Sequence, residues 1–575
     1  MSTPTTTVAV QASLDDRGRL LHEDDVAAQL ALAVTRLEAA LAAAGRSLAG
    51  LAEVEVRTTD RIALLGVLDV LTDRLAATGA RPHTRIREVD RLDRPGQLVA
   101  LAVRLTSTTP REGTVMTLTQ PTTSPAAVAV REACPSCVVL PGDPGYDAAR
   151  VAWNVAVDQR PAAVATPRSV EDVVAVVRAA AAHGLRVAPQ SSGHAAAPLA
   201  GRLGSSVLLR MHELTGVTVD PATRTARVTG GTLWADVVAA AAPYGLTALH
   251  GSSPDVAVAG YTLGGGLSFY ARQHGLAANS VVALEVVTAA GELVRASESE
   301  HAELFWALRG GGGSFGVVVA IELQLLPVAD VVAGMLLWPL ERAPEVVRAW
   351  ARWTREVPET VTTSLRVMSF PPLPELPPFL SGRRIVVIDG ALLEDDHRAA
   401  ELLGPLRALA PEMDTFARMP AAGLLAVHMD PPGPTPNVGD HAVLDALPDA
   451  AVDALLAEVG PGTTTSLLFA ELRHLGGALG RPAAGAGALA QLPGAYALFC
   501  VAVAPFPEAA AVGAADARKV VDALAPFSGG RSILNFAERA ETDASTAFEA
   551  EAVSRLRAVR AEVDPDGVFQ ANHEV

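Results

Sequence analysis

The pattern of apolar and polar residues predicts a small α+β module at the start of the chain. Residues 26–45 carry apolar side chains at helical spacing and end at a glycine that suits a helix C-terminus. Residues 54–60 and 99–105 have the pattern of strands, whereas residues 63–79 again have helical spacing. Threonine, serine and proline then dominate residues 107–124, which is typical of a linker.

A strand–helix–strand pattern follows in the second part of the chain. Ser169 precedes a helical segment at 171–184, which has Asp172 in its first turn and a glycine at its end. An apolar strand at 185–190 then leads directly into a loop of small residues. From there to about residue 328, the pattern predicts mostly short strands and turns.

Strand-like and helical stretches are mixed in the third part of the chain, between residues 329 and 545. The strand-like stretches are 384–393 and 496–504, and the helical ones are 399–410 and 515–525. Prolines cluster at 371–378 and 431–436, where we expect long loops that frame a cleft rather than form core. The last segment, 554–575, reads as a helix followed by an irregular end.

Length and charge narrow the class of protein. A chain of 575 residues exceeds what one hydrophobic core usually supports, so we expect three or more structural units. The net charge of −17 opposes binding to nucleic acid or to an anionic membrane surface. No apolar run approaches the length of a membrane span, and residues 1–13 lack the features of a secretion signal. We therefore expect a cytoplasmic protein.

The three cysteines predict no metal site. Cys134 and Cys137 form a lone CxxC, which is a weak signal for zinc or redox chemistry without a second pair. Cys500 lies in an apolar run and is expected in the core.

Two loops of small residues carry the candidate chemistry. One, at 191–194, ends in His194 and is followed by three alanines; the other spans residues 251–266. A large planar ligand can lie against such backbone, and free N–H groups suit a diphosphate. The alternatives are a histidine bonded within its own loop and an ordinary glycine-rich turn between strands.

The sequence GGGGSFG at 310–316 matches a dinucleotide-binding fingerprint, a nucleophile elbow and a flexible linker. The first two require a strand before the glycines and a helix after them. Here a helical pattern precedes and a strand pattern follows, so the order is reversed. Close approach of the backbone to a ligand or to a neighbouring strand is the better interpretation.

A series of segments from about residue 138 to the end resembles the FAD-linked oxidase family of the berberine bridge enzyme and vanillyl-alcohol oxidase type. The segments include PQSSGH (189–194), AGYTLGGG (259–266), LFWALRGGGGSFGVVV (304–319) and VDPDGVFQANHEV (563–575). The resemblance implies a linker at 113–137, a PCMH-type FAD-binding α+β domain at 138–330, a substrate domain with an antiparallel sheet at 331–545, and a C-terminal segment at 546–575 that returns to the FAD-binding domain.

The same resemblance implies that FAD is covalently bound through His194. Ser253 stands where many members have a second attachment residue, a cysteine, so His194 is the one expected tether. Val256 stands at a position where valine accompanies reaction with oxygen. The other implied cofactor contacts are Gln190, Ser191, Ser192, Gly193, Ala195, Ser252, Asp255, Gly260, Thr262, Gly264, Gly265, Val318 and Asn572.

The implied reaction removes hydride from a C–H bond next to nitrogen or oxygen of a small molecule, with flavin N5 as acceptor and O2 as reoxidant. The base stays open, because Ile533 occupies the position where many members have a tyrosine. Tyr261 and Asn535 are the catalytic candidates, and Glu471, Arg473 and His428 are further polar residues of the substrate domain. A neutral amine substrate needs no strong base, and a dehydrogenase that does not use O2 is the alternative.

Residues 1–112 resemble a different family, the Rid (YjgF-like) proteins, through HEDDVAAQLALAVTRLEAALAAAG (22–45) and REVDRLDRPGQLVALAV (87–103). Active members hydrolyse imines with an arginine; this chain has Thr84 at that position, with Arg85 next to it. Active members also have an acidic residue in the last strand, which this chain replaces near residues 100–102. The resemblance implies a chorismate-mutase-like α+β domain for assembly, often as a trimer, or for ligand binding. The alternative is a bifunctional enzyme in which Arg85 serves imine hydrolysis.

Overall fold

The computed structural model describes residues 7–12, 26–43, 51–59, 82–89, 97–105, 124–372, 376–431 and 433–575, together with a few single positions between 48 and 92. The chain divides into two compact units, Met1–Thr119 and Gln120–Val575.

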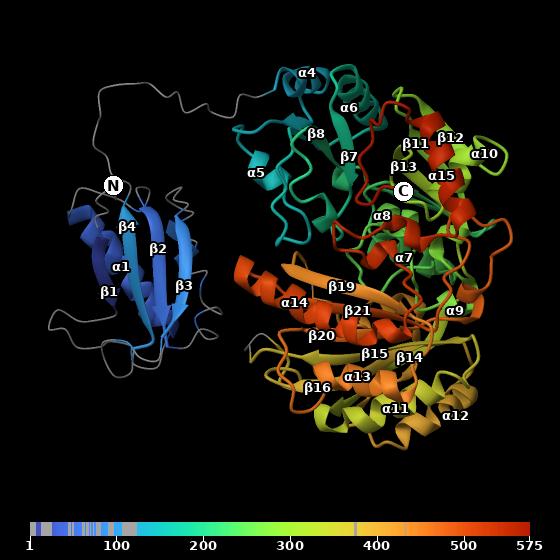
Figure 1. Ribbon diagram of the computed structural model, residues 1–575. Coiled ribbons are helices and arrows are strands. Elements are labelled where there is room, and N and C mark those ends of the chain that lie inside the picture. The colour runs from blue at the N-terminus through green and yellow to red at the C-terminus, as the bar shows by residue number, and fades with distance from the viewer. Residues whose placement is uncertain are drawn as a thin grey trace. The chain divides into compact units, whose positions relative to one another are not determined.

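The first unit contains a four-stranded sheet of order β1-β4-β2-β3 (Figure 1). Its elements are β1 (Thr7–Ala12), α1 (Val26–Ala43), β2 (Leu51–Thr58), β3 (His83–Glu88) and β4 (Val99–Leu105). Leucine and valine side chains of α1 and of the sheet form one buried core, as the apolar spacing predicts. The helix and the two strands predicted here are confirmed, whereas the helix predicted at 63–79 lies largely outside the described residues. Thr84 and Arg85 are exposed on β3.

The second unit begins with a four-stranded sheet that delivers His194 to its position. The elements are α4 (Pro125–Ala133), β5 (Val138–Val139), α5 (Tyr146–Ala149), β6 (Ala163–Ala165), α6 (Val170–Ala182), β7 (Arg186–Gln190) and β8 (Ser206–Arg210), with sheet order β5-β6-β8-β7. The predicted helix start is confirmed, because Ser169 and Asp172 form a capping box at the N-terminus of α6. β7 then ends at Gln190, directly before the loop of His194.

A second, antiparallel sheet has the order β12-β11-β13-β10-β9. Its elements and neighbours are β9 (Val217–Asp220), β10 (Thr225–Thr229), α7 (Trp234–Ala241), α8 (Val258–Leu263), α9 (Ala271–His274), β11 (Val281–Val287), β12 (Leu293–Ser297), α10 (Ala302–Leu308) and β13 (Val317–Gln324). The three short helices α7, α8 and α9 lie where we expected strands and turns. Helices of four to eight residues depend on tertiary packing and leave little periodic signal in a sequence.

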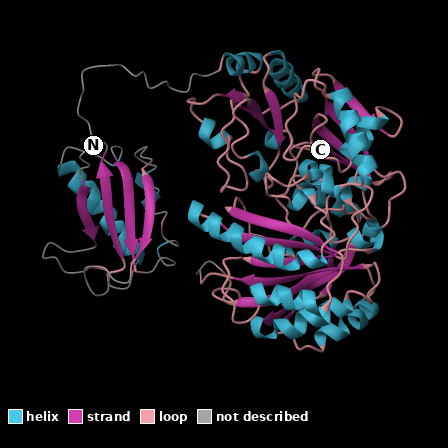
Figure 2. Ribbon diagram, viewed as in Figure 1, coloured by secondary structure: helices cyan, strands magenta, loops and turns pink. Residues whose placement is uncertain are grey.

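The third sheet is antiparallel throughout, as expected, with order β17-β14-β16-β15-β20-β21-β19 and β18 beside β14 (Figure 2). Its strands are β14 (Asp330–Pro339), β15 (Val361–Ser369), β16 (Arg384–Leu392), β17 (Met413–Asp414), β18 (Ala417–Pro420), β19 (Asn437–Leu444), β20 (Phe469–His474) and β21 (Tyr496–Val503). The helices α11 (Ala343–Trp353), α12 (Asp396–Arg407), α13 (Asp449–Val459) and α14 (Pro507–Leu524) pack on one face of this sheet.

The alternation of side chains along β20 and β21 gives this sheet two different faces. Leu472 and Leu498 point to the helices and belong to the core beneath the sheet. Their neighbours Arg473 and Phe499 point the other way and line a cavity. The helix-covered face therefore stabilises the fold, and the other face is available for a ligand.

The C-terminal segment closes the second unit by pairing with β7. After α15 (Ala550–Val563), the backbone N–H of Gln570 donates to the carbonyl of Val187, and Val187 donates in turn to Val568. Asn572 Nδ2 donates to the carbonyl of Ala195, next to His194. The C-terminal end of the chain thus lies beside the loop of His194.

Part of the interval expected to be a linker is the helix α4, whose Ala127 and Val130 are buried. Cys134, directly after α4, forms a disulfide with Cys137 that the sequence did not predict. Cys500 is fully buried, as expected. No cluster of three or more His, Cys, Asp or Glu that suits a metal ion occurs among the described residues.

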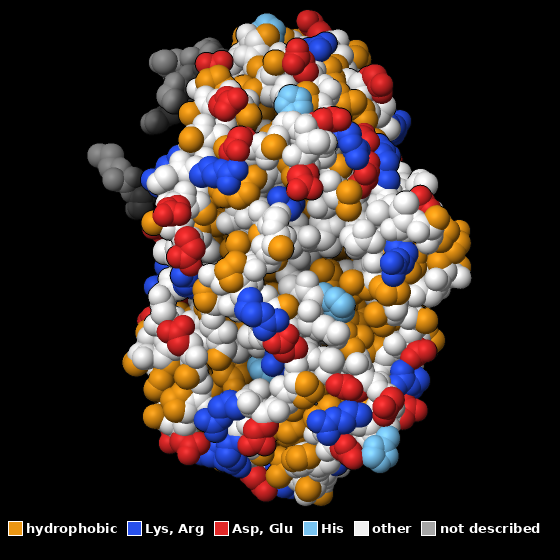
Figure 3. Space-filling model, turned by 90° about the vertical axis from the view of Figure 1, so that its right-hand side faces the viewer, with side chains coloured by type: hydrophobic (Ala, Val, Ile, Leu, Met, Phe, Trp, Pro, Cys, Tyr) orange, Lys and Arg blue, Asp and Glu red, His pale blue; other side chains and the backbone are white. Residues whose placement is uncertain are grey.

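None of the helices in the described part of the chain is long and apolar enough to cross a membrane. On the face seen in Figure 3, acidic and basic side chains are interspersed rather than gathered by sign. Many acidic and basic side chains of the described residues pair with each other, as Arg227 and Glu285 do.

Candidate active site

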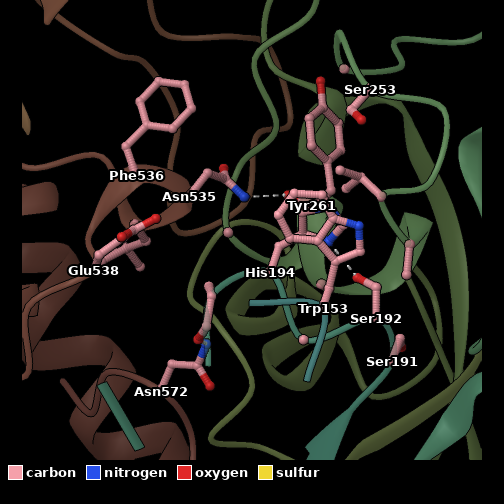
Figure 4. A pocket seen from close by; sticks show the side chains of 18 of the residues that line it. Trp153, Ser191, Ser192, His194, Ser253, Tyr261, Asn535, Phe536, Glu538 and Asn572 are labelled. Carbon is pink, nitrogen blue, oxygen red and sulfur yellow. Dashed lines mark hydrogen bonds between the residues drawn. The ribbon is translucent and has the colours of Figure 1, made fainter. Parts of the chain in front are cut away.

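A cavity of about 390 Å³ opens between the loop of His194, the segment around α8 and the open face of the third sheet (Figure 4). Its walls come from distant parts of the sequence: residues 189–195, 251–264, 312–318, 428–437, 468–503 and 534–538, and the C-terminal residues 570–573.

The ring of His194 is held on three sides. Trp153 stacks on it with ring centroids 4.0 Å apart, and Ser192 Oγ lies 2.9 Å from its Nδ1. Its other nitrogen, Nε2, lies 3.5 Å from Asp255 Oδ1 and is buried without a hydrogen-bond partner. The backbone N–H of Trp153 donates to the carbonyl of Ser192, so the stacking residue is tied to the same loop. His194 is therefore oriented by its surroundings rather than free to turn.

Asp255 lies behind this histidine and accepts two strong hydrogen bonds. Trp153 Nε1 donates to its Oδ2 over 2.6 Å, and Ser253 Oγ donates to its Oδ1 over 2.8 Å. Burial raises the pKa of Asp255, but the neighbouring His194 and the donors Trp153 and Ser253 outweigh burial and hold that pKa well below its usual range. A carboxylate therefore faces His194 at any ordinary pH.

Asn535 fixes the glycine-rich turn after α8. Its Oδ1 accepts from the backbone N–H of Gly266, and its Nδ2 donates to the carbonyl of Tyr261 (Figure 4). A Cβ on Gly264 would lie 2.7 Å from Asn535 Nδ2, so only glycine allows this approach. Asn535 also lines the cavity, but both ends of its side chain are occupied by the turn.

The glycines at 310–316 serve close packing, as predicted. A Cβ on Gly316 would lie 2.4 Å from Val286 Cγ1, and one on Gly311 would lie 2.3 Å from the carbonyl oxygen of Ala307. The order of elements is α10, then the glycines, then β13, which excludes a dinucleotide fingerprint or a nucleophile elbow at this place. Gly312 and Gly313 line the cavity.

The residues at this wall fit FAD. A wall of glycine and serine loops leaves a flat surface, and the buried Oη of Tyr261 has no hydrogen-bond partner within the protein. Buried polar atoms of this kind normally find a partner. A bound flavin, rich in donors and acceptors, supplies such partners.

Most of the predicted cofactor residues line the cavity: Gln190, Ser191, Ser192, Gly193, His194, Ala195, Ser252, Ser253, Val256, Gly260, Gly264, Val318 and Asn572. Asp255, Thr262 and Gly265 are not on its wall. Asp255 contacts His194 from behind, Thr262 is buried in α8, and Gly265 belongs to the turn that Asn535 holds. Of the catalytic candidates, Tyr261, Asn535, Arg473 and His428 line the cavity, whereas Glu471 is fully buried beneath it.

The opposite wall is largely aromatic. Phe499 stacks on Phe536 with centroids 4.8 Å apart, and Phe469 lies edge-on to Phe499. The guanidinium of Arg473 lies 5.2 Å from the ring centre of Phe536. A ring-shaped apolar ligand has a matching surface here.

Buried charges lie beneath this aromatic wall, on the cavity face of the sheet. Arg366 Nη2 donates to Asp389 Oδ2 over 2.5 Å, and His428 Nδ1 lies 2.9 Å from the same oxygen. Burial raises the pKa of Asp389, but His428, Arg366 and Ser364 outweigh it and hold the pKa below its usual range. Asp389 is thus an ionised anchor with no exposed surface.

The same network continues from the sheet to the cavity. Glu471 lies 3.4 Å from His428 Nε2 and 3.0 Å from Arg473 Nε. Arg473 Nη2 donates to Ser252 Oγ over 3.3 Å, and Ser252 donates to Asp430 Oδ2 over 3.2 Å. Asp430 lines the cavity. A continuous chain of polar contacts therefore connects the buried sheet with the ligand space.

Two further ionisable groups in the cavity have shifted pKa values. Burial raises the pKa of Glu538 to about 7 and that of the Tyr261 phenol well above its usual range. Glu538 Oε2 is buried without a partner, and Glu538 lies on the same side of the view as Phe536 in Figure 4. Glu538 exchanges a proton near neutral pH, whereas Tyr261 stays protonated.

Sequence reasoning missed Trp153, Asp430, Phe499 and Glu538. Phe499 has a readable signal, because strict alternation along β21 places it opposite the core residue Leu498. The other three lie in irregular segments, where no periodicity predicts which side chain turns inward.

A comparison with protein families matches residues 161–297 to the FAD binding domain. Among curated relatives, the chain is 36% identical to (R)-6-hydroxynicotine oxidase of Paenarthrobacter nicotinovorans over 202 residues, 35% of this chain and 44% of that protein. It is 34% identical to xylooligosaccharide oxidase of Thermothelomyces thermophilus over 201 residues, 34% of this chain and 40% of that protein. Each match spans less than half of the relative.

Solved structures extend the similarity to most of the chain. 6-Hydroxy-D-nicotine oxidase from Arthrobacter nicotinovorans matches with a TM-score of 0.67 at 24% identity, covering 75% of this chain and 96% of that one. Xylooligosaccharide oxidase from Myceliophthora thermophila matches with a TM-score of 0.66 at 22% identity, covering 78% of this chain and 98% of that one. Residues 161–297 thus match the FAD binding domain, in a chain that shares the fold of these two oxidases.

Proposed function

We propose that the chain is an FAD-dependent oxidase that takes hydride from a C–H bond next to nitrogen or oxygen of a small molecule. One observation carries the proposal: a single cavity joins the small-residue wall around His194 to an aromatic and charged wall on the sheet. FAD, when bound, accepts the hydride at N5 and passes the electrons to O2, which gives hydrogen peroxide.

The protein's own residues have separable roles in this proposal. His194 tethers the flavin, and the loops at 251–266 and 312–318 support it. Asn535 holds the glycine turn rather than acting on the substrate, because both of its polar atoms are engaged. Glu538 and Asp430 are the candidate proton acceptors, since both carboxyl groups line the cavity.

The cavity favours an amine with an aromatic or heterocyclic body over an oligosaccharide. Phe469, Phe499 and Phe536 offer an apolar surface, and the carboxyl groups of Asp430 and Glu538 complement a cationic nitrogen. A polyhydroxylated ligand would leave many of its hydroxyl groups without partners on such a wall.

The absorption spectrum of the purified protein, recorded before and after acid precipitation, tests whether FAD is bound and whether it is attached covalently. Yellow colour that stays in the pellet supports a covalent flavin, and its release in His194→Ala locates the bond. Colourless protein would contradict the proposal. Hydrogen peroxide release with 6-hydroxynicotine and with xylobiose then tests the substrate class, with faster turnover expected for the amine.

Reoxidation separates an oxidase from a dehydrogenase. We propose O2 as the acceptor because Val256 lines the cavity and its side chain occupies the position named above. Oxygen consumption that equals substrate consumption supports this assignment. Turnover that requires an artificial dye instead would favour the dehydrogenase alternative.

For the first unit, we propose a Rid-like role in assembly or ligand binding, supported by its four-stranded sheet and the helix α1. Removal of residues 1–112 should then lower the oligomeric mass, a trimer being the expected state, and leave flavin turnover intact. The bifunctional alternative predicts that Arg85→Ala slows ammonia release from the imine product; unchanged release would exclude it.

A further inference from the structure

The negatively charged carboxylate of Asp255 lies next to the ring of His194. Among the described residues, Asp255 is the carboxylate that pairs with this histidine, with 3.5 Å between Oδ1 and Nε2. About a quarter of each side chain is exposed, so water screens the pair only in part. We propose that Asp255 is a positioning residue for covalent attachment: it stabilises the positive charge that His194 acquires while it bonds to FAD. This inference rests on the covalent tether of the proposed function.

The carboxylate of Asp255 is itself held in place by hydrogen bonds. Trp153 donates to one of its oxygens and Ser253 to the other, so the carboxylate cannot turn away from His194. Trp153 at the same time covers one face of the His194 ring. Trp153 therefore fixes the direction of the His194 ring, and Trp153 and Ser253 together fix the position of the Asp255 carboxylate.

Ser192 completes the arrangement on the other ring nitrogen. Its Oγ lies 2.9 Å from His194 Nδ1, while Asp255 lies on the side of Nε2. A carboxylate beside Nε2 and a hydroxyl beside Nδ1 favour a ring proton on Nε2, toward Asp255. The lone pair of Nδ1 then accepts from the Ser192 hydroxyl, and it forms the bond to FAD when that hydroxyl turns away.

Covalent attachment of FAD to His194 is a two-electron oxidation, and O2 is the oxidant. A C–H bond of the flavin 8-methyl group and the ring N–H of His194 break, and one N–C bond forms. The two electrons and two protons released reduce O2 to hydrogen peroxide. While the N–C bond forms, the imidazole ring carries a positive charge, and Asp255 lowers the free energy of that state because opposite charges attract across a few ångströms.

The experiment follows covalent attachment directly, without any substrate. Protein prepared without bound flavin is mixed with FAD in air, and the share of flavin that survives acid and denaturing electrophoresis is measured over time. We expect Asp255→Asn to bind FAD at the same stoichiometry but to attach it at least tenfold more slowly. Asp255→Glu should recover part of the rate, because it restores the charge. Asp236→Asn, which removes an exposed carboxylate of α7, should match the unsubstituted protein.

Each outcome has a distinct meaning. Attachment by Asp255→Asn at the normal rate overturns the inference. If Asp255→Asn binds no FAD, the double variant Trp153→Phe/Ser253→Ala is measured instead, because it frees the Asp255 carboxylate without removing it. Slower covalent attachment in this variant supports the inference, and attachment at the normal rate overturns it. If the unsubstituted protein binds FAD but releases it in acid, the covalent tether fails and the inference with it. If it binds none, the proposed function itself is wrong.

Discussion

The two walls of the cavity are built on different principles. The wall around His194 consists of loops of glycine, serine and alanine, and its shape depends on backbone that closely approaches neighbouring side chains, as Gly264 approaches Asn535. The wall on the third sheet consists of large side chains on regular strands, and its character is set by buried charges and aromatic rings, as at Asp389 and Phe499.

This difference indicates where a change of specificity is tolerated. On the loop wall an added Cβ at Gly193 or Gly264 would collide with neighbouring side chains, so these positions keep the surface flat. On the sheet wall the backbone N–H and C=O groups are already hydrogen-bonded to neighbouring strands, so the side chains alone select the ligand. The following predictions test this contrast, from the largest expected effect to the smallest.

Asp389→Asn should lower the free energy of unfolding by about 3–5 kcal/mol, because it leaves the guanidinium of Arg366 buried without its counter-charge. Urea denaturation measures the change. The matched control is Glu285→Gln, which breaks an ion pair with Arg227 on the surface and should cost about 1 kcal/mol or less. Equal losses in the two variants would show that the buried charges do not stabilise the sheet wall.

Gly266→Ala should destabilise the protein by about 2–3 kcal/mol and reduce its FAD content. The new Cβ would lie 2.5 Å from Tyr261 Cε1 and 2.7 Å from Ala277 Cβ, at a φ of +76°. Gly275→Ala is the control, since Gly275 has a similar φ of +80° but no atom within 4 Å of the added Cβ. Thermal unfolding and the flavin-to-protein ratio measure both variants. A loss no greater than that of Gly275→Ala would mean that close approach does not shape the loop wall.

Asn535→Ala should cost about 1–3 kcal/mol, because the N–H of Gly266 and the carbonyl of Tyr261 each lose a hydrogen-bond partner. Asn535→Asp keeps the acceptor for Gly266 and should cost less. Urea denaturation gives the order of the two variants. If instead both keep full stability and FAD content but lose turnover, Asn535 acts on the substrate rather than on the turn.

Glu538 should make stability depend on pH. Its pKa is raised to about 7 in the folded protein, so between the ordinary carboxyl pKa and pH 7 the folded state binds more protons than the unfolded state. The contribution of the neutral carboxyl is therefore present at pH 4 and is lost as the pH rises through 7. Thermal unfolding at pH 5 and pH 8 should show a larger decline for the unsubstituted protein than for Glu538→Gln. The same decline in both would place the titration elsewhere.

Part of the site was readable in the sequence because local rules determine it. The capping box of Ser169 and Asp172 and the end of β7 follow from spacing alone, and these elements place the loop of His194. The resemblance to FAD-linked oxidases supplied the residues of the loop wall, most of which line the cavity. Asp255 and Thr262 were predicted as contacts but lie behind that wall, since spacing along a loop does not show which side chain faces the ligand.

The sequence by itself determined the long helices and strands, their apolar faces and the loop that carries His194. Only the tertiary structure decided what faces this histidine: Trp153 comes from 41 positions earlier and Asp255 from 61 positions later. It also decided that the charges of β15, β16 and β20 meet beneath one cavity, because the register between strands determines which side chains become neighbours. Periodicity fixes the face of a side chain within its own element, whereas the partner across a sheet or a loop depends on how the whole chain closes on itself.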